Sequence, residues 1–173
     1  TSLGVLLIAG LVTACIPDGP TFSVARLEDG VDANPGDGVC EVTPGLGDCS
    51  LRAAVMEANA GEGPAAVLLS RSDYRLTLHG SDQIAALGDL DITDSLTVFG
   101  NGATIDADGG EQAVDVRPTD AEARVTISDV TVTGSTSGSA VRIGSGRVVV
   151  ERTTITGNSS IIAPALRSEE HTS

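Results

Sequence analysis

The residues best suited to bind a metal ion lie in one short segment, Asp-Ala-Asn-Pro-Gly-Asp-Gly, in the first quarter of the chain. Asp32, Asn34 and Asp37 supply carboxylate and amide oxygens there, and proline and glycine let the backbone turn between them. Calcium prefers about six to eight oxygen ligands of this kind. The spacing is not that of an EF-hand, and Asx turns explain the same residues without an ion. We therefore predict no cofactor and Asx turns at these residues, and calcium bound by Asp32, Asn34 and Asp37 is the alternative.

Cys15 is a candidate for lipidation. It follows an apolar run, Leu3–Val12, that is too short to span a bilayer but suits a signal peptide. The segment Val-Thr-Ala-Cys resembles the bacterial lipobox, in which the cysteine is lipidated and the preceding peptide is removed. The alternative is an ordinary signal peptide with a chance cysteine. We expect residues 1–14 to be a signal peptide that lacks its start, and residues 15–21 to be the lipidated cysteine and a linker.

Cys40 and Cys49 are the remaining two cysteines. In an exported chain, two thiols in a loop without other regular structure are expected to form a disulfide. A metal site would need histidine or further cysteine nearby, and this stretch of the sequence has none. The bond is expected to stabilise the segment by about 2–3 kcal/mol, chiefly by constraining the unfolded chain.

Catalytic chemistry has less support. A hydrolase needs carboxylates that converge on one face, and a lyase needs a base, for which Arg142, Arg147 and Arg152 are available. Arginine on a β surface is more often an ordinary solvent-facing residue. We therefore predict no catalytic residue and lean against an enzyme. The aspartates that gather in the middle of the chain are Asp89, Asp91, Asp94, Asp106 and Asp108.

The net charge limits the possible partners. The chain has 24 acidic and 10 basic residues, and its formal net charge is −14. Such a surface repels phosphate, so we exclude nucleic acid as a partner. The same repulsion argues against polyanionic sugars, unless a cation such as Ca²⁺ lies between the two.

Two pairs of similar segments predict the elements that must position these residues. The segment that begins at Val125 recurs 23 residues later at Val148, and Ala113–Val116 recurs 27 residues later at Ala140–Ile143. Short β-branched strands with a period in the twenties are typical of a solenoid of stacked β coils. The residues expected to point into its core are Val125, Ile127, Val132, Val148, Val150 and Ile155.

One helix is predicted, at residues 50–59. Ser50 is a suitable N-cap, and Gly61 is a suitable stop. The first coil of a β-solenoid exposes unpaired backbone groups and an open core, so we expect an amphipathic helix to cover it as a cap. The apolar stripe of this helix consists of Leu51, Ala54, Val55 and Ala58.

The segment from about Phe22 to Leu69 resembles a known family, the CSLREA-type N-terminal domain of bacterial secreted β-helix proteins. Ala53 stands where the family has glutamate. The resemblance implies a right-handed parallel β-helix of pectin-lyase-like fold and export from the cytoplasm; it is weak for activity, because the family is largely uncharacterised. The matching residues are Cys49, Ser50, Leu51, Arg52, Ala54, Ala58 and Asn59.

The expected fold is therefore all-β, a right-handed parallel β-helix with a short N-terminal helix cap, truncated at its C-terminal end. Residues 22–69 form the cap with its disulfide loop, and residues 70–166 form the coils. Residues 167–173 match no upstream pattern and read like the translation of a common sequencing-library adapter. We therefore expect this tail to lie outside the native sequence.

A stiff β rod on a lipid anchor suits adhesion or polysaccharide binding without catalysis. We expect an exported protein of the cell envelope or outer-membrane surface, or a secreted one. Its expected partners are the membrane, through the lipid, and an extracellular polysaccharide or a host or cell surface. The alternative is a polysaccharide lyase or glycoside hydrolase with its active face in coils beyond Leu166. The enzyme hypothesis requires a coil on which aspartates converge with Arg, Lys or His. The hypothesis of a non-catalytic surface protein does not require such a coil.

Overall fold

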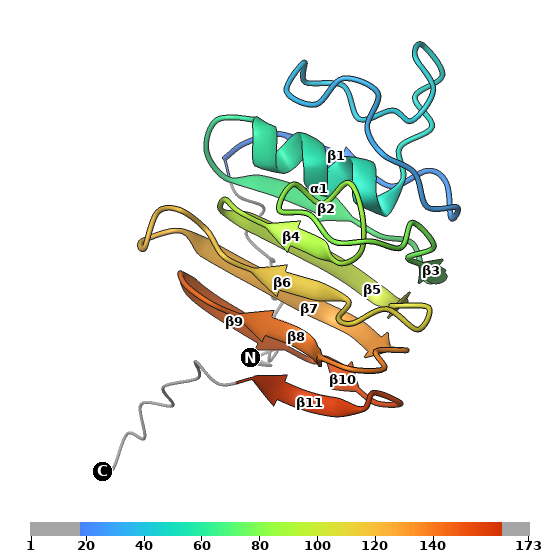
Figure 1. The fold of residues 1–173 in the computed structure, drawn as a ribbon. Coiled ribbons are helices and arrows are strands. Elements are labelled where there is room, and N and C mark those ends of the chain that lie inside the picture. The colour runs from blue at the N-terminus through green and yellow to red at the C-terminus, as the bar shows by residue number, and fades with distance from the viewer. Residues whose placement is uncertain (1–17, 164–173) are drawn as a thin grey trace, which may run out of the picture.

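The computed structural model describes residues 18–163 as a parallel β-solenoid of about three turns with one short helix at its first coil (Figure 1). The predicted solenoid is thus confirmed. Its elements in chain order are β1 (Thr21–Ser23), α1 (Leu51–Ala60), β2 (Ala65–Leu68), β3 (Asp73–Arg75), β4 (Leu90–Ile92), β5 (Leu96–Asp106), β6 (Val114–Val116), β7 (Arg124–Thr133), β8 (Ser139–Ile143), β9 (Arg147–Glu151), β10 (Thr154–Ile155) and β11 (Ser160–Ala163).

The strands form two parallel sheets that run along the stack. The larger sheet has the order β1-β2-β5-β7-β10, with β3 also paired with β5 and β9 also paired with β7. The smaller sheet has the order β4-β6-β8-β11. Neighbouring strands come from successive coils, so each residue lies beside its counterpart in the next coil. Val98, Ile127 and Val150 form one such row.

The core between the sheets is narrow and aliphatic. Three of the predicted core residues, Val125, Ile127 and Val132, are buried. Aromatic residues make up only 2% of the chain, and Val, Ile, Leu and Ala form most of the core cluster, which also includes Phe22 and Tyr74. The alternation of buried and less buried residues along β5 and β7 follows the period of two expected for strands.

The predicted core residues of the last coil are less buried. Val148 and Ile155 are only partly buried, and Val150 is 38% exposed, so the prediction of a buried Val150 is wrong. The register still places Val150 on the inward-facing row with Ile127. Within residues 18–163, β9 pairs with β7 alone, so no described strand covers its far edge.

The helix begins and ends close to the predicted residues. Ser50 is its N-cap and accepts a hydrogen bond from the Ala53 N–H through its hydroxyl, and Gly61 follows its end. The predicted stripe of Leu51, Ala54, Val55 and Ala58 is buried, as expected. The helix contacts β2 and β4, at the first coil.

The polar side of α1 is buried as well as its apolar stripe. Arg52 and Glu57 are as inaccessible as the apolar stripe. The long loop before the helix explains this burial, since the N–H groups of Gly36 and Gly38 both donate to the Glu57 carboxylate. Figure 1 shows this loop lying over the helix on the side away from the coils. The cap is therefore a sandwich of loop, helix and first coil.

The helix also satisfies backbone groups of the first coil. The Asn59 side chain donates to the Asp91 carbonyl at 2.7 Å and accepts from the Thr93 N–H at 2.9 Å. One amide side chain thus replaces the strand that would otherwise pair with β4. This is the pairing that an uncovered sheet edge would seek from another molecule.

Candidate functional site

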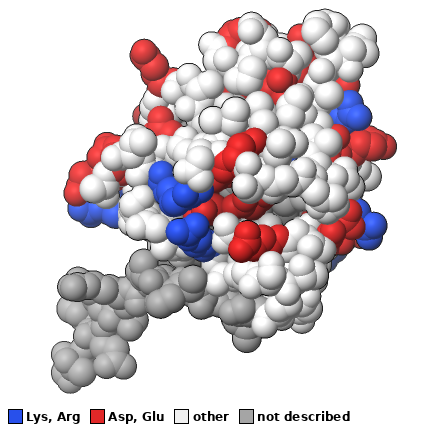
Figure 2. Space-filling view, viewed as in Figure 1, with Lys and Arg blue, Asp and Glu red and all other residues white. Residues whose placement is uncertain are grey.

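A row of charged side chains crosses the outer face of the smaller sheet. Asp91 on β4 lies beside Asp115 on β6, and Asp115 lies beside Arg142 on β8. Their neighbours along the strands, such as Leu90 and Val114, are buried in the core, so the alternation of a strand turns the charged residues outward. Figure 2 shows acidic and basic side chains gathered over these strands.

The two aspartates are buried although they lie on the outer face. Asp91 and Asp115 are each 1% exposed. The segment that precedes β4 accounts for part of this burial, because the Ala85 N–H donates to Asp91 Oδ2 at 3.2 Å. Ala85 adopts a positive φ of 61°, which is unusual for a residue with a Cβ. The loop is thus held in a specific conformation over the carboxylates.

Arg117 joins the two buried carboxylates. Its Nη2 lies 2.8 Å from Asp91 Oδ1, and its Nε lies 2.8 Å from Asp115 Oδ2. The remaining nitrogen donates to Gln83 Oε1 at 3.1 Å, so the same guanidinium also contacts the covering loop. Arg142 contacts Asp115 Oδ2 at 3.4 Å. A guanidinium can serve several acceptors in this way because its five donors spread in one plane.

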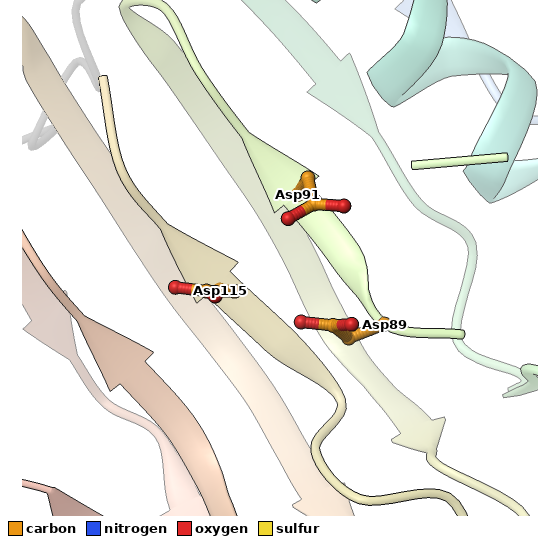
Figure 3. A group of neighbouring side chains, drawn as sticks. All are labelled: Asp89, Asp91 and Asp115. Carbon is orange, nitrogen blue, oxygen red and sulfur yellow. The ribbon is translucent and has the colours of Figure 1, made fainter. Parts of the chain in front are cut away.

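A third carboxylate, Asp89, completes the group that we name the acidic cluster: Asp89, Asp91 and Asp115. One oxygen from each lies within 4.8 Å of the others, and Figure 3 shows the three carboxylates over the neighbouring strands β4 and β6. Asp89 Oδ2 accepts from Gln112 Nε2 at 3.1 Å. Burial, reinforced by the Asp91 charge, raises the pKa of Asp89 to about 6.

Asp115 is the member of the cluster that has an oxygen without a hydrogen-bond donor among the described residues. Burial raises its pKa, and the charges of Arg117 and Arg142 oppose that rise. Both arginines contact Oδ2, whereas Oδ1 is buried and has no hydrogen-bond partner among the described residues. A buried carboxylate oxygen without a donor is destabilising. This orphaned oxygen belongs to a side chain that lines a pocket.

The pocket has a volume of about 460 Å³ and is lined mainly by polar groups. Its wall combines the cluster members Asp89 and Asp115 with the donors Arg117, Arg142 and Gln112. A volume of this size lies in the range of about 300–1,000 Å³ that is usual for small-molecule sites. The pocket presents hydrogen-bond acceptors and donors side by side, which suits a ligand with hydroxyl groups.

Arg52 on α1 connects the cap with the loop that covers the acidic cluster. Its guanidinium, 0% exposed, forms a double ion pair with Asp29 at 2.7 and 3.0 Å. It also donates to the carbonyls of Ala85 at 2.8 Å and Gly88 at 2.7 Å. These carbonyls belong to the loop that covers the acidic cluster. Arg52 therefore ties the position of that loop to the cap helix.

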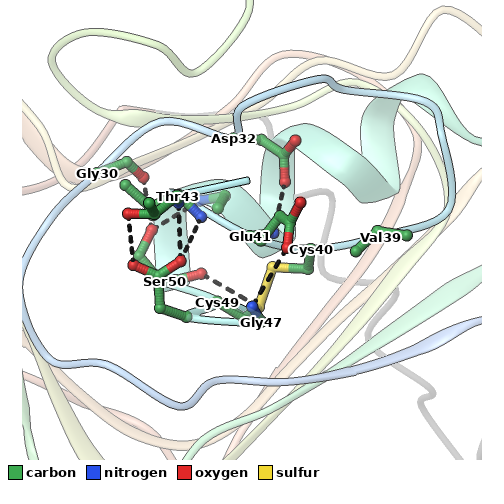
Figure 4. Close-up of a disulfide and its surroundings, with 12 residues drawn as sticks. Gly30, Asp32, Val39, Cys40, Glu41, Thr43, Gly47, Cys49 and Ser50 are labelled. Carbon is green, nitrogen blue, oxygen red and sulfur yellow. Dashed lines mark hydrogen bonds between the residues drawn. A yellow bond between two sulfur atoms is a disulfide. The ribbon is translucent and has the colours of Figure 1, made fainter. Parts of the chain in front are cut away.

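The predicted disulfide between Cys40 and Cys49 is confirmed, with a Cα–Cα distance of 5.0 Å (Figure 4). It closes a loop that Asp48 also holds, through hydrogen bonds from the backbone of Val42 and Thr43. Cys49 is buried against the core cluster that includes the helix stripe. The disulfide is therefore part of the cap and lies apart from the pocket lining.

The residues predicted to bind calcium form hydrogen bonds within their own loop. Asp32 accepts from the N–H groups of Asn34 and Glu41, and Asp37 accepts from the Val39 N–H and from the Asn34 side chain. These contacts match the Asx-turn interpretation, which explains the residues without an ion. Calcium at Asp32, Asn34 and Asp37 stays a prediction. Cys15, predicted to be lipidated, lies outside the described residues.

The candidate arginines and aspartates divide between several places. Arg142 lies at the pocket, whereas Arg147 pairs with Glu122, and Arg152 pairs with Asp129. Of the five predicted aspartates, only Asp89 and Asp91 join the cluster; Asp106 and Asp108 lie near Arg75.

Sequence reasoning missed Asp115 and Arg117. A usable signal existed, because the repeat that aligns Ala113–Val116 with Ala140–Ile143 also sets Asp115 beside Arg142. Applying the same register one coil earlier would have placed Asp91 beside Asp115 in the same row.

The fold and the site together define a parallel β-solenoid protein with a capped first coil and a polar pocket on its outer face. In the part of the chain that the structure describes, no helix has the length and apolar character needed to cross a membrane. No family model, curated protein or solved structure matches the chain. Membership of the CSLREA-type family therefore remains a prediction based on the residues around the cap helix.

Proposed function

We propose that this protein is an exported, lipid-anchored β-solenoid that binds an extracellular polysaccharide in the pocket beside the acidic cluster. The observation that carries the proposal is the pairing of free acceptors with fixed donors in one pocket. Asp115 Oδ1 has no hydrogen-bond partner within residues 18–163, and Arg142 and Gln112 lie on the same wall. Sugar hydroxyls donate and accept at once, so they match such a wall.

The charge of the chain narrows the substrate class. A net charge of −14 disfavours a polyanionic polymer, so a neutral polysaccharide is the expected ligand. The pocket lining contains no Phe, Tyr or Trp for a sugar ring to stack on. Hydrogen bonds alone give weak binding, and we expect a dissociation constant of about 0.1–1 mM for a short oligosaccharide.

Titration calorimetry with neutral oligosaccharides tests the proposal. Arg142→Gln removes a charged donor from the pocket wall and is expected to weaken binding by about tenfold, because a charge-assisted hydrogen bond contributes about 1.5–3 kcal/mol. Asp129→Asn, on the other sheet and with a positive φ that asparagine tolerates, is the matched control and should bind normally. Equal loss in both variants would contradict a role for the pocket.

One observation favours a second candidate function, cleavage of the bound polysaccharide. The carboxylates of Asp89 and Asp115 are neighbours, with one oxygen of each no more than 4.8 Å apart, and glycoside hydrolases use a pair of carboxylates at the scissile bond. The convergence of aspartates with Arg117 and Arg142 is also the feature that the sequence argument required of an enzyme. In this candidate the active face lies in the described coils and not beyond Leu166.

Product analysis separates the two candidates. Hydrolysis and elimination both create new reducing ends, and elimination, which needs an acidic sugar, also creates an unsaturated product; Asp89→Asn should abolish either reaction. Unchanged polysaccharide after long incubation, with oligosaccharide binding intact, would leave the non-catalytic rod as the function.

A further inference from the structure

The spacing of the acidic cluster matches one cation. Calcium holds its oxygen ligands at about 2.3–2.6 Å, so two ligands on opposite sides of one ion are about 4.6–5.2 Å apart. Oxygens of Asp89, Asp91 and Asp115 all lie within 4.8 Å of one another. This bound is compatible with one calcium ion lying within reach of all three carboxylates. Magnesium, with ligands at about 2.0–2.1 Å, requires a tighter set.

The orphaned oxygen of Asp115 is an independent sign of a missing positive partner. The side chain is 1% exposed, and Oδ2 receives both arginines while Oδ1 receives no donor among residues 18–163. Oδ1 belongs to a carboxylate that lies among two others. Arg117 supplies a positive charge between Asp91 and Asp115, and a further cation near Asp115 Oδ1 would stabilise the grouped carboxylates.

The charges around the cluster leave one negative charge over. Two of the three carboxylates, Asp91 and Asp115, contact the guanidinium groups of Arg117 and Arg142. The remaining contacts, from the Ala85 N–H to Asp91 and from Gln112 to Asp89, are neutral donors. Arg52 lies nearby but forms its own ion pair with Asp29. A divalent cation at the cluster would offset this excess and bring the net charge of the group from −1 to +1.

We propose that Asp89, Asp91 and Asp115 form a binding site for a divalent cation of the calcium class, beside the pocket on the outer face of the coils. The site is distinct from the Asp32, Asn34 and Asp37 loop. Three protein ligands leave the other coordination positions to water or to a ligand in the pocket. The proposal does not depend on polysaccharide binding. It extends that function, because a bound cation would also admit an acidic sugar despite the charge of the chain.

Calorimetric titration of the chelator-treated chain with CaCl₂, at constant ionic strength, tests the site. We expect one ion per chain with a dissociation constant of about 0.1–1 mM, the usual range of extracellular calcium modules. MgCl₂ should bind at least about tenfold more weakly. The half-buried Asp89 is the safest position to change, and Asp89→Asn should weaken calcium binding by about tenfold or more because it removes a charged ligand.

Two further variants locate the ion. Asp108→Asn changes a carboxylate close to the pocket that is not in the cluster, at a positive φ that asparagine accepts, and calcium binding should persist. Asp37→Asn should likewise leave binding unchanged. Loss of binding in Asp37→Asn with retention in Asp89→Asn would assign the ion to the loop and overturn the proposal.

Absence of any calcium binding up to 10 mM (about tenfold above the expected constant) would also overturn it. Oligosaccharide binding is measured separately in the presence of chelator. Failure of the cation site and failure of the polysaccharide site are therefore distinguishable. Asp115→Asn, checked for native circular dichroism, provides a second ligand variant that should lose calcium in the same way as Asp89→Asn.

Discussion

At the scale of single residues, aspartate side chains fix the irregular parts of this molecule. Asp48 is the clearest case, since its carboxylate accepts from the backbone of Val42 and Thr43, from the Thr43 hydroxyl and from Arg26. The backbone hydrogen bond from Thr43 is the largest of the effects that lower the pKa of Asp48 below its ordinary value. A lowered pKa means that the folded loop favours the ionised carboxylate.

The stability of the folded chain should therefore depend on Asp48 in acid. Because the folded pKa is below the unfolded value of 3.8, the contribution is complete above the unfolded pKa and is lost as the pH falls through the folded pKa. Urea unfolding of the wild type and of Asp48→Asn is measured from about pH 2 to pH 6. The wild type should have the higher free energy of unfolding near pH 6, and the difference between the two proteins should narrow as the pH falls. Parallel curves across this range would contradict the assignment.

At the scale of elements, the cap is held to the first coil by one buried charged group. Arg52 connects α1 with Asp29 in the preceding loop and with the carbonyls of the loop that covers the acidic cluster. Asp29 also accepts from the Leu78 N–H. Removing the guanidinium would leave the buried Asp29 carboxylate without its cation and the carbonyls of Ala85 and Gly88 without this donor, which is far more destabilising than loss of an exposed pair.

Arg52→Met is expected to lower the free energy of unfolding by about 3–5 kcal/mol. Arg75→Met is the matched control, because Arg75 is 63% exposed in its pairs with Asp106 and Asp108, and it should change stability by less than about 1 kcal/mol. Urea denaturation measures both. If the two variants are equally stable, the buried ion pair does not hold the cap.

At the scale of the whole molecule, each coil is stabilised by its neighbours, as in other solenoids. Ile127 and Val150 occupy the same row of the larger sheet in successive coils. Ile127 is 2% exposed between two coils, whereas Val150 is 38% exposed on the last described one. The same position in the repeat therefore contributes very differently to stability.

Truncation of the two side chains to alanine measures this difference. Ile127→Ala should destabilise the fold by about 2–5 kcal/mol, since it leaves a cavity in a closed interior. Val150→Ala removes a side chain that is already partly in water, and a loss below about 1 kcal/mol is expected. Thermal or urea unfolding of both variants gives the comparison. Similar losses would show that Val150 is covered in solution.

The regular parts of this fold could be predicted from the sequence because repetition encodes them. Val125 and Val148 mark equivalent strands, so one register fixes many contacts at once. The helix and the disulfide were also accessible, through a capping serine and a pair of cysteines in one loop. The same repeats overestimated the burial of Val150, because a pattern does not state whether a further coil covers it.

The pocket could not be predicted in the same way. Its members come from different coils and from an irregular loop whose shape depends on a positive φ at Ala85, for which alanine gives no signal. Asp115 and Arg117 lie on opposite sides of Val116 in the sequence, yet they meet through the long reach of the arginine side chain. The burial of Arg52 likewise follows from a loop that covers the helix, which no helical period reveals.

The location of the pocket has an evolutionary consequence. Its charged wall is complete once β4, β6 and β8 are stacked, and the loop that covers it is anchored to α1 at the opposite end from β9 and β10. Duplication or deletion of repeat units after β8 would change the length of the rod without altering a single group in the pocket. Selection can thus adjust how far the protein extends without changing the pocket.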